Sequence, residues 1–340
     1  MPKSTLPPNL IIKLGRWGWE QVWHVMMSQM APRGKDGAYI RPESAFRDSV
    51  SADSEAKYPA AAGRYRLFVG MSCPWAHRAL VVRSLKGLES AIPITVVSPS
   101  PEAGGWIFDE PFADFKGPAA GTTCLSLAQF YRQAHPGYGG RNTVPVLWDG
   151  EGNGIVNNES SEIIVILNEA FNEFAAHPEL DLYPEALRAE IEQWNAKIYP
   201  AINNGVYRCG FAQTQAAYDA VIEELFGALD AIDGVLAQRR YLCGGQLTLA
   251  DVRLFTTLVR FDVAYHGIFR CDRRRIADYP NLSGYLRDIY QLPGIAATCD
   301  IPAVKRDYYG NLFPLNPGGL IPAGPDIERL LMQPSDRQPL

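Results

Sequence analysis

The spacing of apolar and polar residues becomes regular at Arg64. Residues 64–69 alternate in polarity and are rich in β-forming side chains, which predicts a strand. Residues 76–86 then place apolar side chains at helical spacing, and Gly87 ends the predicted helix. Residues 94–97 form a second β-rich run. A strand, a helix and a strand in this order predict a parallel pair of strands.

A second group of elements follows a long insertion that contains Trp106 and many Gly and Pro residues. Residues 143–148 predict a strand that opens with a proline, and a hairpin turn at Asp149-Gly150 leads to a short returning strand. Residues 162–168 predict a helix with polar residues at its N-terminus. The order β-α-β, a break and β-β-α therefore covers about residues 64–170.

Beyond residue 184 the apolar positions recur at helical spacing, which predicts an all-helical region. The sequence Thr248-Leu-Ala-Asp251 is typical of a capping box, with Asp in the usual place of Glu or Gln, and marks the start of one helix. The predicted helices cover residues 184–203, 214–239, 249–265 and 279–290.

Both ends of the chain lack such a pattern. Residues 1 to about 60 look irregular, and Trp17, Trp19 and Trp23 belong to an arm that either covers a groove or, more simply, packs on the body. The last forty residues are rich in Pro and Gly, which predicts a tail. The sequence thus predicts an N-terminal extension, an α/β domain, an all-α domain and a C-terminal tail, with bounds of 1–60, 61–175, 176–300 and 301–340.

Length, composition and charge narrow the function. The chain has 340 residues, 47% hydrophobic and 20% charged, enough for two domains with buried cores. The net charge of −5 argues against a general nucleic-acid or membrane-surface binder, because both need a basic excess. No apolar run is long enough to span a bilayer, and residues 1–6 lack the features of a signal peptide. We therefore expect a cytoplasmic protein.

The cysteines are scattered along the chain, without a CxxC pair. An even number of cysteines permits disulfides, but such frameworks belong mainly to small secreted chains. In a large acidic chain we expect free thiols. The five histidines do not lie at ligand spacing from any cysteine, so no metal is expected. The six cysteines are Cys73, Cys124, Cys209, Cys243, Cys271 and Cys299.

Cys73 is the strongest candidate for chemistry, because it lies between the first predicted strand and the first turn of a helix. Unpaired backbone N–H groups and the helix dipole stabilise a thiolate there, and a lowered thiol pKa makes a cysteine nucleophilic. His77 and Arg78 would add positive charge. The alternative is a buried, inert cysteine. Because position 76 is Ala, no second thiol lies at CxxC spacing, and the resolving thiol must come from elsewhere, most simply from a small thiol in solution.

Two further segments offer polar groups to a ligand. If the Val144-Pro145 bond is cis, Val144 presents its backbone N–H and C=O groups, although a proline at the start of a strand is more often structural. Ser160 at a helix N-terminus offers donors to a carboxylate, and Glu159 offers an acceptor to an ammonium group. Together they would hold the α-carboxylate and α-amino group of an amino acid. A helix cap with a solvated Glu is an equally good interpretation.

Tyrosines are candidates for proton transfer. A tyrosine hydroxyl donates to a thiolate or delivers a proton. With sixteen tyrosines in the chain, none is distinguished by its type alone. The four in unusual local sequence are Tyr207, Tyr265, Tyr308 and Tyr309.

Taken in order, seven segments resemble the glutathione transferase superfamily, and more closely its xi class, the glutathionyl-hydroquinone reductases. The resemblance covers about residues 35–325 and implies a thioredoxin-like N-terminal domain followed by an all-helical domain. Each segment alone is a weak signal. The segments are Cys73-Pro-Trp-Ala-His-Arg78, residues 140–148, residues 156–164, Asn203-Asn-Gly-Val-Tyr207, Arg260-Phe-Asp262, residues 274–282 and residues 316–325.

The resemblance implies a role for each matching residue. Cys73 is the nucleophile and Tyr207 the proton donor, while Tyr265 and Tyr308 keep the thiolate stable and line an aromatic pocket. Family members form homodimers through the helical domain. Glutathione would be bound by Trp106, Arg141, Asn142, Thr143, Val144, Glu159 and Ser160.

The implied reaction is the glutathione-dependent reduction of S-glutathionyl-hydroquinones through a Cys73–glutathione mixed disulfide, which a second glutathione resolves as oxidised glutathione. The alternatives are an omega-like thiol transferase or dehydroascorbate reductase, a protein deglutathionylase, a conjugating transferase, and a binding module without activity. The chain departs from the family pattern at Leu249, at residues 310–312 and at Asp307, where the family has His. We expect Asp307 to add negative charge near the pocket, which would oppose the thiolate.

Overall fold

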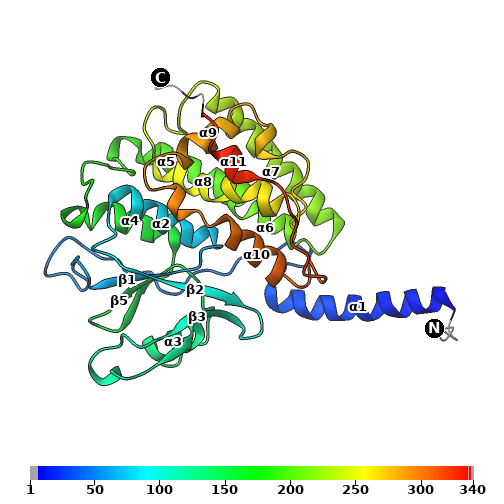
Figure 1. The fold of residues 1–340 in the computed structure, drawn as a ribbon, viewed down its shortest axis with the longest axis horizontal. Helices are drawn as coiled ribbons and strands as arrows, with labels where there is room; N and C mark the ends of the chain where they lie inside the picture. The colour runs from blue at the N-terminus through cyan, green and yellow to red at the C-terminus, as the bar shows by residue number, and fades with distance from the viewer. Residues whose placement is uncertain (1–6, 336, 338–340) are drawn as a thin grey trace.

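A six-stranded mixed sheet forms the core of the N-terminal half of the chain (Figure 1), in a computed structural model that describes residues 7–335 and 337. Residues 1–6, on which the signal-peptide prediction rests, lie outside that range. The strand order is β4-β3-β2-β1-β5-β6. The strands are β1 (Tyr65–Val69), β2 (Ile94–Ser100), β3 (Gly105–Phe112), β4 (Cys124–Ser126), β5 (Val146–Asp149) and β6 (Gly154–Asn157).

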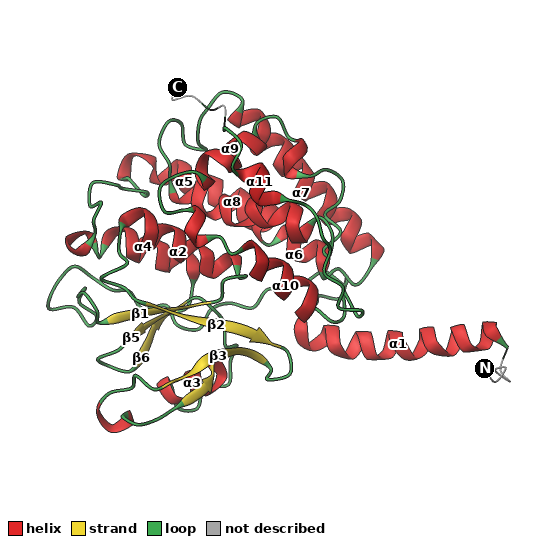
Figure 2. Cartoon of the chain, in the orientation of Figure 1, coloured by secondary structure: helices red, strands yellow, loops and turns green. Residues whose placement is uncertain are grey.

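The predicted strand–helix–strand unit is confirmed. β1 pairs in parallel with β2, with Leu67 opposite Ile94, and α2 (Pro74–Lys86) connects them. β5 runs antiparallel to β1, and β6 returns beside β5 as the predicted hairpin. These strands, with α2 and α4 (Ser160–Glu169), give the predicted thioredoxin-like arrangement, in which α2 and α4 pack together above the sheet in Figure 2.

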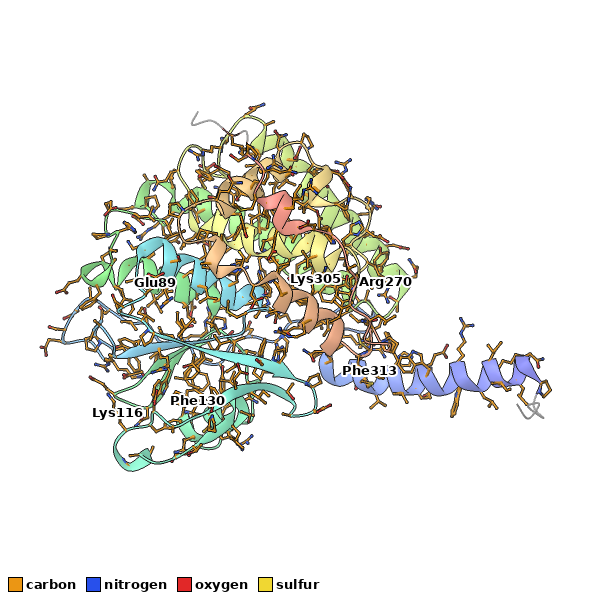
Figure 3. The ribbon with its side chains drawn as sticks, viewed as in Figure 1. Glu89, Lys116, Phe130, Arg270, Lys305 and Phe313 are labelled. Atoms are coloured by element: carbon orange, nitrogen blue, oxygen red, sulfur yellow. The ribbon has the colours of Figure 1, made fainter. Side chains whose placement is uncertain are left out.

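The insertion after β2 is more regular than its Gly and Pro content indicates. It contains β3, β4 and α3 (Leu127–Ala134), and α3 lies on the other side of the sheet from α2 and α4 (Figure 2). Phe130, labelled in Figure 3, packs there against Phe68 and Trp148. The Gly and Pro residues mark the turns between short elements, so they conceal the strands from a periodicity search.

The second half of the described chain is helical, as predicted. A capping box opens α8: the Thr248 backbone N–H and hydroxyl both donate to the Asp251 carboxylate at 2.8 Å. Two predicted helices are interrupted, because residues 199–203 and 261–265 form π-helical turns. The main helices are α5 (Arg188–Ile198), α6 (Gly205–Gly210), α7 (Gln215–Leu236), α8 (Leu249–Arg260) and α9 (Leu282–Tyr290).

The N-terminal prediction is wrong in its irregular structure and only partly right in its packing. Pro8–Met30 is the helix α1, most of which projects away from the body (Figure 1), although Trp23 near its C-terminal end packs on the core. Trp17 remains 64% exposed, whereas Met27 is fully buried and Trp19 meets Phe313 edge to face. Most of α1 packs against nothing among the described residues, so its apolar residues are not confined to one face of the helix. Without a single apolar face, the sequence lacks the helical periodicity that would predict this element.

The predicted C-terminal tail also contains helices, α10 (Ile301–Asn311) and α11 (Ile327–Leu331). The Asp300 side chain accepts a hydrogen bond from the backbone N–H of Ala303 and so caps α10. Gly and Pro residues gather mainly between the two helices. Their number explains why the composition of the last forty residues predicts a tail without helices. The predicted domain bounds stay a prediction. No helix in the described residues combines the length and hydrophobicity needed to cross a membrane.

Candidate active site

Cys73 occupies the N-cap position of α2, directly after the turn that ends β1. Cys73 is partly exposed as a residue; its backbone N–H donates to the carbonyl of Gly70 at 3.0 Å, and its sulfur lies 3.8 Å from the carbonyl of Val144. Gly70 is required here, because a Cβ atom at that position would overlap the indole ring of Trp106. The turn therefore brings the sulfur and the indole to one surface.

The local environment of the thiol differs from the sequence-based expectation. Burial raises the pKa of the Cys73 thiol above its ordinary value. Hydrogen bonds from the backbone N–H groups of Ala76 and Trp75, and the charges of Arg260 and Arg41, act in the opposite direction but do not outweigh burial. The predicted helix N–H groups are present, but the prediction that the position alone lowers the pKa is wrong.

This raised pKa predicts a steep pH dependence of Cys73 alkylation. Because the neutral thiol predominates at neutral pH, the reactive thiolate should become about tenfold more abundant per pH unit between about pH 7 and 9. The rate of iodoacetamide modification, followed by mass spectrometry of the Cys73 peptide, should rise accordingly. A rate that is already constant below pH 7 would contradict the raised pKa.

His77 does not supply the predicted positive charge. Its ring is fully buried, and burial, followed by the charge of Arg260, lowers its pKa well below the ordinary value. Nδ1 lies 2.8 Å from Nη1 of Arg260, which is only a donor, so Nδ1 accepts. The proton is then on Nε2, 2.8 Å from the hydroxyl of Thr298. His77 is therefore a neutral residue of the interior.

An apolar pocket lies over Cys73, and its wall carries a chain of tyrosine hydroxyls. The hydroxyls of Tyr207 and Tyr308, which both line the pocket, are 2.6 Å apart, and the hydroxyl of the fully buried Tyr265 is 3.0 Å from that of Tyr308. Burial, followed by the charges of Tyr265 and Cys73, raises the pKa of Tyr207 well above its ordinary value. Tyr207 thus keeps its proton at any physiological pH, as a proton donor must.

Two other predicted residues occupy different places. Tyr309 does not line this pocket. It packs beside Gly267, and a Cβ atom added to Gly267 would overlap the Tyr309 hydroxyl. Asp307 does line it and is only 8% exposed. Burial raises the pKa of Asp307, while contacts with Ser72 and with Arg306, 3.1 Å away, lower it. Burial outweighs these contacts, so the pKa of Asp307 is raised.

A second, polar pocket begins at Val144, whose peptide bond to Pro145 is cis. Glu159 and Ser160 lie on the wall of this pocket at the start of α4, together with the predicted Arg141 and Thr143. Two predicted ligands differ from the others: Trp106 lines the apolar pocket instead, and Asn142 lines neither pocket.

The Glu159 carboxylate is held by donors on both oxygens. Oε1 accepts from the backbone N–H and hydroxyl of Ser161 at 3.0 and 2.9 Å, and Oε2 accepts from the hydroxyl of Ser44 at 2.9 Å. Burial acts to raise the pKa of Glu159, but these bonds and the charge of Arg78 outweigh it, so the pKa is lowered. Glu159 therefore caps α4 and also presents a fixed negative charge to the pocket. A helix cap and a ligand for an ammonium group are thus compatible roles for this residue.

Arg78 lies behind this pocket and not beside the sulfur. It donates to the Ser160 hydroxyl at 3.2 Å and to the Asn203 side chain at 2.7 Å, and it stacks on the ring of Trp75. Burial lowers its pKa to about 9, so it stays charged at neutral pH. Because Ser160 accepts from Arg78, its own hydroxyl proton remains available to an incoming carboxylate.

One wall of the polar pocket comes from a segment that sequence analysis did not single out. Residues 41–45 and Arg47 line it, with Arg41 stacked 4.0 Å from the centroid of Trp75 and Ser44 bonded to Glu159. Backbone and side-chain bonds between Phe46 and Asn158 fix the segment against the start of α4. The bonds from Ser44 to Glu159 and between Phe46 and Asn158 join residues more than a hundred positions apart, which a local pattern does not reveal. Among the described residues, no group of His, Cys, Asp or Glu is arranged to hold a metal ion.

Comparison with known proteins matches two family models, the N-terminal domain of glutathione S-transferases over residues 72–170 and their C-terminal domain over residues 215–288. The glutathionyl-hydroquinone reductase YqjG of Escherichia coli is 46% identical over 314 residues, which cover 89% of this chain and 93% of that protein. The glutathionyl-hydroquinone reductase PcpF of Sphingobium chlorophenolicum is 43% identical, with 90% of this chain and 94% of that protein covered.

Solved structures agree with the sequence relatives. The glutathione-bound structure of YqjG superimposes with a TM-score of 0.78 at 44% identity, covering 86% of this chain and 95% of that one. The xi glutathione S-transferase of Phanerochaete chrysosporium gives a TM-score of 0.79 at 44% identity, covering 86% of this chain and 94% of that one.

Proposed function

The chain belongs to the glutathione S-transferase family, in its xi class, and we propose that it is a glutathionyl-hydroquinone reductase in which Cys73 carries the reaction. Its co-substrate is glutathione. The observation that carries the assignment to Cys73 is that this residue lines the apolar pocket while its sulfur lies 3.8 Å from the carbonyl of Val144, a residue of the polar pocket. The apolar pocket with its tyrosine hydroxyls suits an aromatic ring, and the polar pocket suits a peptide with charged ends.

The reaction proceeds in two steps. The Cys73 thiolate attacks the sulfur of the glutathionyl-hydroquinone, a sulfur–sulfur bond forms, and the bond from sulfur to the aromatic carbon breaks. That carbon takes the electron pair and a proton, which Tyr207 supplies from the pocket wall. The thiolate of a second glutathione then attacks the mixed disulfide, releasing oxidised glutathione and the Cys73 thiolate.

The other members of the site hold the reactants. Tyr308 and Tyr265 pass hydrogen bonds along the chain that begins at Tyr207 and help to stabilise the thiolate. Trp106 covers the aromatic ring of the substrate. In the polar pocket, Glu159 binds the ammonium group of glutathione and Ser160 binds its carboxylate, with Arg78 behind. The remaining contacts to glutathione come from Arg141, Thr143 and Val144, which line this pocket, whereas a contact from Asn142 stays a prediction.

The charge of Glu159 should determine the affinity for glutathione. In Glu159→Gln, the amide oxygen still accepts the N–H of Ser161, so the helix cap survives while the charge is lost. Losing one charge-assisted hydrogen bond should raise the KM for glutathione by about tenfold or more and change kcat little. Steady-state kinetics with varied glutathione measure both constants. The control is Glu169→Gln, at the other end of α4, which should leave the KM for glutathione unchanged. If Glu159→Gln also left this KM unchanged, the proposed contact between Glu159 and glutathione would be wrong.

Parallel steady-state assays test the reaction class. We expect turnover of glutathionyl-menadiol, with one oxidised glutathione released for each aromatic product, and little turnover of dehydroascorbate or of a glutathionylated protein. Activity with dehydroascorbate but none with glutathionyl-menadiol would overturn the proposal in favour of an omega-like reductase. Formation of a conjugate from glutathione and an electrophile, as the main activity, would favour a conjugating transferase.

We further propose that the protein is cytoplasmic and forms a homodimer through its helical region. All six cysteines are free thiols, which supports a reducing compartment. The dimer rests on family membership. Light scattering during size-exclusion chromatography tests it, and a monomeric mass would reject it.

A further inference from the structure

Arg260, the last residue of α8, is buried without a carboxylate partner. Its guanidinium is 1% exposed and makes four hydrogen bonds within the described residues. Nε donates to the carbonyl of Ser72 at 2.9 Å, and Nη2 to that of Met71 at 3.1 Å. Nη1 donates to the carbonyl of Thr256 at 2.9 Å and to Nδ1 of His77 at 2.8 Å. All four acceptors are neutral.

A buried cation without an anion is strongly destabilising, so such a cation indicates that an anion forms nearby. Arg260 holds the carbonyls of the two residues that immediately precede Cys73, and its charge lowers the pKa of that thiol. The carboxylate nearest in sequence, Asp262, is directed elsewhere, because it accepts from the backbone N–H groups of Ile276 and Ala277.

The other titratable groups around this site leave the thiol of Cys73 as the anion that the reaction requires. His77 on α2 is neutral, and burial keeps the protons on Tyr207, Tyr265 and Tyr308 by raising their pKa values. Three groups remain. The carboxyl of Asp307 is paired with Arg306, and burial raises the pKa of the Cys299 thiol to about 11. Arg41, on the segment before β1, is a second cation.

We propose that Arg260 is the positioning residue of Cys73: its charge favours the thiolate, and its two bonds to the preceding turn aim the sulfur at the pocket. The inference rests on the proposed function, because it assumes that Cys73 reacts as a thiolate. His77 completes the arrangement. Its Nε2–H is directed at the hydroxyl of Thr298, which in turn donates to the Ile295 carbonyl. Nδ1 of the neutral ring is therefore free to accept from Arg260, whose positive charge stays on the guanidinium.

Arginine substitutions separate the charge from the hydrogen bonds. Arg260→Gln keeps donors for the Ser72 and Met71 carbonyls but removes the charge, whereas Arg260→Lys keeps the charge and loses the planar fork. Arg253→Met is the matched control, because Arg253 lies on the same helix, seven residues or about 10 Å away, and contacts the carbonyl of Ser161. The measurement is the rate of iodoacetamide modification of the Cys73 peptide between about pH 6 and 10.5, with circular dichroism as a check on folding.

We expect the rate at pH 8 to fall about tenfold or more in Arg260→Gln, with the midpoint of its profile shifted upward by at least about one pH unit. Arg260→Lys and Arg253→Met should keep the midpoint near the wild-type value. A purely structural role would change the rate without moving the midpoint, and that result would overturn the proposal, as would an equal shift in Arg260→Lys. If Arg260→Gln does not fold, Arg260→Lys alone decides: a retained midpoint supports the proposal and an upward shift rejects it.

This experiment contains neither glutathione nor a quinone. A failure of Arg260 to influence the thiolate would therefore leave the proposed reaction standing. Conversely, a wild-type protein that does not reduce glutathionyl-menadiol would reject the proposed function whatever the alkylation profile shows.

Discussion

Replacing Cys73 by serine should reduce glutathionyl-menadiol turnover by about a thousandfold or more, to the background rate. A serine hydroxyl does not ionise near neutral pH, and it has no sulfur with which to form the mixed disulfide. Steady-state release of the aromatic product measures the loss. Cys73 occupies the N-cap of α2, where serine is a favoured residue whose hydroxyl can accept from the same backbone N–H groups, so the variant should fold normally.

The control for this substitution is Cys299→Ser. Cys299 is the other partly exposed cysteine, so it is the second thiol that a small reagent would reach. Burial raises its pKa to about 11, so it is mostly protonated at neutral pH. Its replacement should leave turnover within about twofold of wild type. An active Cys73→Ser variant, or an inactive Cys299→Ser variant that is folded, would contradict the role of Cys73 as nucleophile.

Replacing Tyr207 by phenylalanine should lower kcat for glutathionyl-menadiol by about a hundredfold or more. The ring still packs against Phe211 and Phe269, but the hydroxyl that contacts Tyr308 in the pocket wall is lost. Because the raised pKa keeps Tyr207 protonated, its loss removes a donor and not an anion. Stopped-flow measurement of aromatic product release in a single turnover isolates this step.

The same variant should keep the second step of the reaction. A Cys73–glutathione disulfide prepared beforehand should react with glutathione at nearly the wild-type rate in Tyr207→Phe, since no aromatic carbon needs a proton there. Tyr309→Phe is the control, because that side chain lies beside Gly267 and does not line the pocket. A kcat in Tyr207→Phe within twofold of wild type would show that the proton comes from another source.

Local physics made part of this molecule predictable. Alternation in β1, helical spacing in α2 and the Thr248–Asp251 box each depend on neighbours in sequence, and all three are confirmed. The strand-to-helix turn that singles out Cys73 is of the same kind. In contrast, α1 has no buried face along most of its length, so it leaves no periodic signal to detect.

The properties that tune the site depend on distant contacts. Burial of Cys73 in the fold, where it shares a pocket with residues more than a hundred positions later such as Tyr207 and Tyr308, reverses the expected shift in the pKa of the thiol. The neutrality of His77 follows first from its burial and then from the charge of Arg260, at the end of another helix. The hydrogen bond between Ser44 and Glu159 likewise joins a segment without a recognisable pattern to the start of α4. None of these effects has a sequence signature, because each results from tertiary packing.

The most direct measurement is the intact mass of the protein after reaction with one equivalent of glutathionyl-menadiol and no free glutathione. The account predicts one glutathionyl adduct per chain, located on Cys73 by peptide mapping and removed by added glutathione, and no adduct on Cys73→Ser. A wild-type Cys73 that remains unmodified while aromatic product is released would contradict it.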